Sequence, residues 1–127
     1  MKGYILYEVK VPILGFNDKN KMNIKQLDNN YYILEMDRKE DTNMYLLSSN
    51  SVASFDIDIN DEDLRKLQIT EKTKISIYYT ILINNPVSDS LVNLSAPIII
   101  NEDKKLMGQC IINSSNYLYD TLGKINI

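Results

Sequence analysis

The sequence predicts an all-β fold: a small antiparallel β-barrel of about six to eight strands, with one short helix near residues 61–67. Three observations support this prediction. Apolar and polar residues alternate in short runs, clusters rich in Asn and Asp separate the runs, and one segment has the pattern of a helix start. With 127 residues and 44% hydrophobic content, the chain is sized for one core. No repeat or linker divides it, so residues 1–127 are expected to form a single domain.

The clearest strand pattern lies at residues 75–83. Its odd positions are all Ile or Tyr, whereas its even positions mix Ser, Tyr, Thr and Leu. Because successive side chains of a strand point to opposite faces, we expect the odd positions to face the core. Weaker strand patterns occupy residues 5–11, 31–36, 44–48, 54–59 and 106–113. Turn signals lie at residues 17–20, 28–30, 84–86 and 101–103.

A single helix is predicted in the stretch NDEDLRKL, residues 60–67. Asn60 can cap the free backbone amides, and the acidic residues 61–63 would lie at the positive end of the helix dipole. The basic residues 65–66 follow toward the negative end. Leu64 and Leu67 supply only a narrow apolar edge, which predicts a helix of about two turns.

The stretch LVNLSAPIIIN, residues 91–101, reads as a strand with a proline inside it. Its even positions are all apolar and are expected to face the core, which would place Pro97 on the outer face. Because proline donates no hydrogen bond to a strand ladder, Pro97 predicts an edge or a bulge where the strand bends.

Composition excludes several kinds of chemistry. The chain has no histidine, so Ser–His–Asp and Cys–His catalysis and zinc sites built on imidazole are absent. Gly-rich phosphate loops are also missing. Cys110 is the single cysteine and is expected to be a small buried apolar side chain. We therefore expect no enzyme activity and no cofactor, although a pair of carboxylates could still support hydrolysis.

Charge and targeting signals suggest the kind of partner. The net charge is −3 with a pI near 4.9, and the lysines are scattered along the chain. This balance disfavours direct binding of nucleic acid and favours a basic protein partner. The sequence has no apolar stretch long enough for a membrane helix and no secretory signal, so we expect a cytoplasmic protein without membrane contact.

The densest group of charges lies in FDIDINDED, residues 55–63. Its spacing matches the start of a calcium loop but fails at the sixth position, Asp61, and at the twelfth, Leu67, so a metal site is not predicted. Two interpretations remain open: a solvated strand face followed by a capped helix, or a surface that meets a basic partner. Nine tyrosines could also stack on nucleic-acid bases, but Tyr is a common strand residue and we favour that role.

Three segments occur together in order: PILGF at residues 12–16, VNLSAPIIIN at 92–101 and MGQCII at 107–112. This combination resembles the FliW family of flagellar assembly factors, and the acidic stretch before the predicted helix is similar to the family's pattern. The resemblance implies a small β-barrel without enzyme activity. It also implies two partners: the RNA-binding translational regulator CsrA, whose repression of flagellin mRNA FliW proteins block, and flagellin itself.

The resemblance suggests a partner-binding surface, and the residues indicate where it lies. We expect the surface that faces CsrA to include the acidic stretch and its neighbouring aromatic residue, namely Phe55, Asp56, Asp58, Asp61 and Glu62. Asn93 and Asn101 are further candidates, each of which could instead satisfy backbone groups near the bend at Pro97. The alternative function is that of a small acidic β-barrel binding module unrelated to flagella, with nucleic acid as a candidate ligand.

Overall fold

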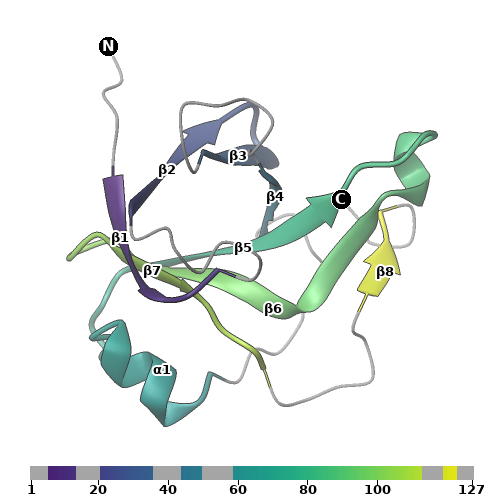
Figure 1. Ribbon diagram of the computed structural model, residues 1–127. Coiled ribbons are helices and arrows are strands. Elements are labelled where there is room, and N and C mark those ends of the chain that lie inside the picture. Colours follow the sequence, from purple (N-terminus) through teal and green to yellow (C-terminus); the bar gives the residue numbers. More distant parts are fainter. Residues whose placement is uncertain (1–5, 14–20, 36–43, 50–58, 113–118, 123–127) are drawn as a thin grey trace.

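The structure is a computed structural model that describes residues 6–13, 21–35, 44–49, 59–112 and 119–122 (Figure 1). The predicted turn at residues 17–20 and nearly all of the predicted strand at 54–59 lie outside these ranges. The strands are β1 (Leu6–Val11), β2 (Lys21–Gln26), β3 (Tyr31–Glu35), β4 (Met44–Ser48), β5 (Ile75–Leu82), β6 (Leu91–Asn101), β7 (Leu106–Gln109) and β8 (Tyr119–Thr121). The helix α1 spans Asp61–Lys66, and a 3₁₀ turn, η3, spans Val87–Asp89.

The strands close into a barrel. Their order is β5-β4-β3-β2-β1-β7-β6, and a further pairing between β5 and β6 completes the ring, while β8 adds to β6 outside it (Figure 1). The predicted small β-barrel with one short helix is therefore confirmed. One pairing departs from the antiparallel prediction, because β1 and β7 run parallel.

The core of the barrel lies inside the ring of strands. Its buried residues come from β1, β2, β3, β4, β6 and β7 and from the segment after β1: Tyr7, Ile13, Met22, Leu34, Leu46, Ile98, Ile100 and Met107. Burying a large apolar side chain contributes about 1.5–3 kcal/mol, so this cluster contributes strongly to the stability of the barrel. Tyr78 also packs against it, from an even position of β5.

The outer wall of the barrel is also buried, in two places. Near α1, Leu67 packs with Ile99, Leu106 and Cys110. Beside β8, Leu122 packs in a second cluster that contains Leu47, Tyr79, Ile81, Val92 and Leu94. These clusters correct the prediction for β5, because its odd positions Tyr79 and Ile81 are buried on the outside of the barrel rather than in its interior.

Strand β6 bends, as its proline predicts. Tyr78 of β5 pairs with Ile98, but Thr80 pairs with Asn93, so the register between the strands shifts strongly across the segment that contains Pro97. The sequence predicts Pro97 on the outer face of the strand, and the structure shows that Pro97 is buried, so it is covered rather than open to solvent. Both faces of β6 are covered beyond the bend: Ile98 and Ile100 fill the barrel, and Ile99 packs in the cluster near α1.

Local signals predicted the helix and the β2–β3 turn well. Asn60 is the N-cap of α1, and its Oδ1 accepts a hydrogen bond from the backbone N–H of Asp63 at 2.8 Å. In the β2–β3 turn, Asp28 Oδ1 accepts from the backbone N–H groups of Asn30 and Tyr31. The strands β2 and β8 were not predicted, because β2 carries only Met22 and Ile24 as an alternating pair and β8 is short. No helix within the described ranges is long and apolar enough to cross a membrane.

Candidate partner-binding surfaces

The first turn of α1 presents two of the predicted acidic residues to solvent. Asp61 and Glu62 are exposed at the N-terminal end of the helix, where carboxylates are favoured by the helix dipole. Glu62 Oε2 lies 3.5 Å from Lys66 Nζ, but both side chains are largely exposed, so this ion pair is weak. Phe55, Asp56 and Asp58, the other members of the predicted surface, lie outside the described residues.

The third acidic residue of α1 points inward instead. Asp63 is only 9% exposed and accepts a hydrogen bond from Asn60 Nδ2 at 3.2 Å. It also lies beside Cys110. Burial, followed by the neighbouring Asp63 carboxylate, raises the pKa of the Cys110 thiol to about 12. The thiol is therefore protonated at neutral pH and unreactive, which confirms the prediction that Cys110 is a buried packing residue.

Asn101 has a structural role at the end of β6. Its side chain is fully buried, and its Nδ2 donates to the carbonyl oxygens of Leu67 at 2.8 Å and Gln68 at 3.2 Å. Its Oδ1 accepts from the backbone N–H of Lys104 at 3.0 Å. These bonds join the end of α1 to the turn between β6 and β7, and they leave Asn101 without a surface for direct contact with a partner.

Asn93, in contrast, reaches the surface. It is half-buried in β6, and its Oδ1 accepts from both the backbone N–H and the hydroxyl of Ser95, at 3.0 and 2.9 Å. Its Nδ2 has no hydrogen-bond partner among the described residues. The two predicted asparagines therefore have different roles: Asn101 is buried inside the fold, whereas Asn93 has an Nδ2 donor at the surface without a partner among the described residues.

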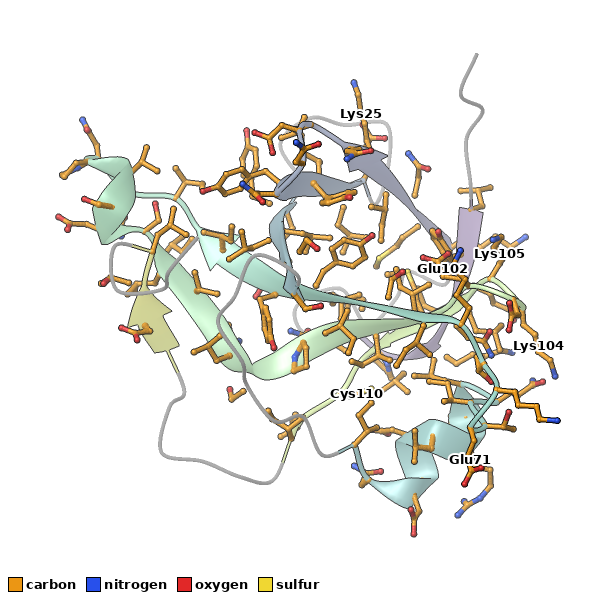
Figure 2. The ribbon with its side chains drawn as sticks, turned by 180° about the vertical axis from the view of Figure 1, so that it is seen from behind. Lys25, Glu71, Glu102, Lys104, Lys105 and Cys110 are labelled. Carbon is orange, nitrogen blue, oxygen red and sulfur yellow. The ribbon has the colours of Figure 1, made fainter. Side chains whose placement is uncertain are left out.

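The fold gathers lysines that are separated in the sequence. Lys74 donates its backbone N–H to Asp103 Oδ2 and accepts from the backbone N–H of Glu102, which places it against the β6–β7 turn. Lys104 and Lys105 lie in this turn (Figure 2). This surface carries both signs, since Lys105 Nζ lies 3.9 Å from Glu102 Oε1. Sequence reasoning missed it, because the two segments are distant in the chain.

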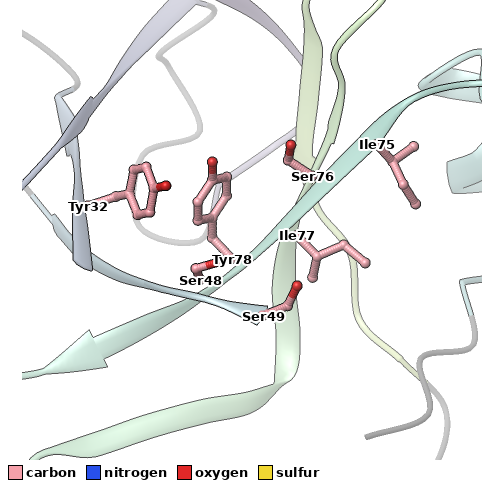
Figure 3. Close-up of a pocket in the computed structure, with 7 residues that line it drawn as sticks. All are labelled: Tyr32, Ser48, Ser49, Ile75, Ser76, Ile77 and Tyr78. Atoms are coloured by element: carbon pink, nitrogen blue, oxygen red, sulfur yellow. The ribbon is translucent and has the colours of Figure 1, made fainter. Parts of the chain in front are cut away.

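A small cavity opens where β4 and β5 separate. It has a volume of about 210 Å³ and is lined by Tyr32, Ser48, Ser49, Ile75, Ser76, Ile77 and Tyr78 (Figure 3). The rings of Tyr32 and Tyr78 pack edge to face, with their centroids 4.8 Å apart. Burial, with the nearby Tyr32 and Glu102, raises the pKa of Tyr78 to about 12, so its hydroxyl is neutral. The cavity thus offers neutral hydroxyls, and the described residues that line it include no pair of carboxylates for acid–base chemistry.

The architecture defines a class of protein: a small, closed, mixed β-barrel with one capped helix against its outer wall. The same architecture is found in the crystal structure of the flagellar assembly factor FliW, which matches with a TM-score of 0.85 and 27% sequence identity over 97% of this chain and 89% of that chain.

Comparison of sequences agrees. Flagellar assembly factor FliW of Campylobacter lari is 31% identical over 111 residues, covering 87% of this chain and 85% of that protein. FliW of Sulfurimonas denitrificans is 29% identical over 121 residues, covering 95% of each chain. The sequence model of the FliW protein family matches residues 3–121. The chain therefore belongs to the FliW family of flagellar assembly factors.

Proposed function

We propose that this flagellar assembly factor binds the translational regulator CsrA, relieves its repression of flagellin mRNA, and also binds flagellin. The observation that carries the proposal is its membership of the FliW family, since the family match spans residues 3–121. In this role the protein works by binding alone, in the cytoplasm, and needs neither a cofactor nor catalysis.

Charge supports CsrA as a partner. CsrA binds RNA and must therefore carry a basic surface, whereas this chain has a net charge of −3. Exposed Asp61 and Glu62 would attract such a surface and would repel the phosphates of the competing RNA. The proposed CsrA-facing surface consists of these two residues together with Phe55, Asp56 and Asp58.

Two partners give the protein a switch. While flagellin accumulates in the cell, it occupies the assembly factor, and CsrA remains free to repress translation. Once flagellin is secreted, the assembly factor is released and captures CsrA, so translation resumes. This coupling requires only that binding of one partner lowers the affinity for the other, and thermodynamic linkage makes the effect reciprocal.

The test is co-purification of the full chain with CsrA and with flagellin, first separately and then in competition. Each partner should bind alone, and an excess of flagellin should displace CsrA. If neither protein co-purifies with the chain, the proposal is wrong. If both bind at once without loss of affinity, the binding assignments stand but the switch is wrong.

A second candidate function is direct binding of nucleic acid by a small barrel, which the lysines beside the β6–β7 turn favour. Lys74, Lys104 and Lys105 lie near one another, although Glu102 and Asp103 accompany them. A gel-shift assay with flagellin leader RNA separates the two functions. The CsrA proposal predicts a shift only when CsrA is present, and the alternative predicts a shift by the chain alone.

A further inference from the structure

At one end of the barrel the ends of β5 and β6 extend with β8 as an arm (Figure 1), and residues 80 and 81 of β5 also pair there with β4. The arm consists of residues 80–82 of β5, 91–93 of β6 and 119–121 of β8, with the turn η3 near its tip. In this register Thr80 lies opposite Asn93, which lies opposite Tyr119. The bend of β6 separates the part that pairs with β8 from the part that pairs with β7.

One face of the arm is packed in a buried cluster, and the other is more exposed in the part of the chain that the structure describes. Ile81 and Val92 point to the packed side, where they are buried in the cluster with Leu122. Residues directly opposite one another on paired strands share a face, so a second row lies on the other side. We call this row the arm face, and its described side chains are Thr80, Leu82, Leu91, Asn93 and Thr121.

The arm face is uncharged and partly accessible, and two of its five side chains, Leu82 and Leu91, are apolar. Leu82 is 65% exposed, and the other members of the arm face are half-buried. Two more exposed apolar residues lie at the tip beyond it, with Ile83 at 44% and Val87 at 56% exposed. Single exposed apolar residues are ordinary on protein surfaces, but several together on a projecting element mark a site of association.

The arm is also nearly free of charge. Residues 75–101 of the sequence contain one charged residue, Asp89, which is exposed in η3. Strand β8 adds Asp120, which lies opposite Val92 on the packed side, and Lys124 follows β8 in the sequence. Along β5 and β6 the nearest basic residues are Lys74 and Lys104, at the opposite end of these strands. A row without charges, with exposed apolar residues and Asp89 at the tip beyond it, is complementary to an apolar surface with a basic border.

From these observations we propose that the arm face is a docking surface for an amphipathic α-helix of a protein partner, whose apolar stripe is flanked by Lys or Arg. The inference rests on the proposed function, which supplies the partners, and adds the surface that one of them uses. The geometry favours a helix: strands lie about 4.8 Å apart, so three strands span about 10 Å, the diameter of a helix. A sheet with one open face completes its layer by packing a helix on it.

Asn93 gives this surface a directional contact. It lies in the central strand of the arm, and Ser95 holds its Oδ1 in place through two hydrogen bonds. The side chain is thereby fixed with its Nδ2 donor free within the described part of the chain. A polar side chain beside the stripe of the incoming helix can accept this bond, which would set the register of the helix on the arm.

The experiment measures the affinity of purified CsrA and purified flagellin for the wild-type chain and matched variants by calorimetry. Leu82→Lys places a charge on the arm face, and Leu6→Lys is its control, because Leu6 is 57% exposed on β1. We expect Leu82→Lys to weaken the binding of one partner by about tenfold or more, and Leu6→Lys to leave it within about twofold. Asp89→Lys should weaken the same partner most at low salt, whereas exposed Glu71→Lys should not.

The outcomes separate this inference from the proposed function. Suppose that the wild-type chain binds a partner, and that the Leu82→Lys variant binds both partners with the same affinity as the Leu6→Lys variant. The arm face is then not the docking surface, while the proposed function stands. If the wild-type chain binds neither partner, both this inference and the proposed function are wrong. Hydrogen exchange on the bound partner should protect a segment with apolar residues three and four apart, and protection of an extended strand instead would overturn the helix. A wild-type dimer that Leu82→Lys dissociates would assign the face to a second copy and overturn the proposal.

Discussion

The hydroxyl of Tyr7 donates a hydrogen bond of 2.9 Å to Oε1 of Glu102, across 95 positions of the chain. Ser76 donates to the other oxygen of the same carboxylate. These bonds tie β1, β5 and the β6–β7 turn together at one end of the barrel, close to the parallel pairing of β1 with β7. They also give each oxygen of a carboxylate that is only 18% exposed a hydrogen-bond donor.

Removal of this contact should loosen the barrel. Tyr7→Phe deletes one donor to a partly buried carboxylate, and we expect the free energy of unfolding to fall by about 1.5–3 kcal/mol. Denaturant unfolding measures the change. Tyr7→Phe combined with Glu102→Gln should cost less than the sum of the two single changes, because the residues act as a pair. Additive effects would show that the contact contributes nothing.

Alkaline pH should destabilise the protein through its buried tyrosines. Burial raises the pKa of Tyr78 and of Tyr79 from 10.0 to about 12. Below pH 10 both are neutral in the folded and unfolded states, so they add no pH dependence. Between pH 10 and 12 only the unfolded chain ionises, and stability falls by up to about 1.4 kcal/mol per pH unit for each tyrosine.

Unfolding measured from pH 8 to 12 checks this prediction. Tyr78→Phe should flatten the loss, whereas Tyr45→Phe should not, because Tyr45 is 44% exposed. Cys110 adds a similar loss that begins near pH 9, since its pKa rises from 9.0 to about 12. Equal slopes for wild type and Tyr78→Phe would contradict the assignment of the loss to Tyr78.

Gly108 should not tolerate a side chain. It pairs with Val11 across the parallel strands, and a Cβ added at Gly108 would lie 2.5 Å from Val11 Cβ. Gly108→Ala therefore forces the strands apart, and we expect a loss of about 1–3 kcal/mol. Thermal unfolding measures it. Val11→Ala should rescue little because it keeps the clashing Cβ, and an unaltered melting temperature for Gly108→Ala would refute the close approach.

The two asparagines near the ends of β6 should respond differently. Asn101→Ala removes a buried side chain that satisfies two carbonyl groups and one backbone N–H, and should cost about 2–4 kcal/mol of stability. Asn93→Ala removes only contacts with Ser95 and should cost about 1 kcal/mol or less. Denaturant unfolding of both variants compares them. A larger loss for Asn93→Ala would show that Asn93, rather than Asn101, is the asparagine that stabilises the fold.

Charge reversal should weaken CsrA binding. We expect Asp56→Lys with Asp58→Lys to lower the affinity for CsrA without loss of fold, and Asp61→Lys to act in the same direction, because each adds a cation facing a basic partner. Calorimetry at low and high salt measures the effect, and circular dichroism reports the fold. Glu71→Lys is the control, as an exposed acidic residue outside the proposed surface. Unchanged affinity at low salt would refute the electrostatic proposal.

Much of the fold followed from local patterns. Alternation indicated β5, hydrogen-bonding side chains indicated the cap of α1 and the β2–β3 turn, and Pro97 indicated the bend of β6. These features depend on neighbours a few residues apart, so the sequence displays them directly. The short strand β8 lacked such a pattern, and the parallel pairing of β1 with β7 depends on segments about a hundred residues apart in the chain.

The candidate surfaces were less predictable. The sequence by itself determined the acidic balance, the absence of histidine chemistry and the family resemblance, all of which are properties of composition and order. Only the tertiary structure decided that Asp63 and Asn101 turn inward, that Pro97 is buried, and that Leu82 and Asn93 share an open face of a projecting arm. The reason is physical: alternation assigns a residue to one side of a strand, but which sides are covered depends on what the rest of the chain packs against them.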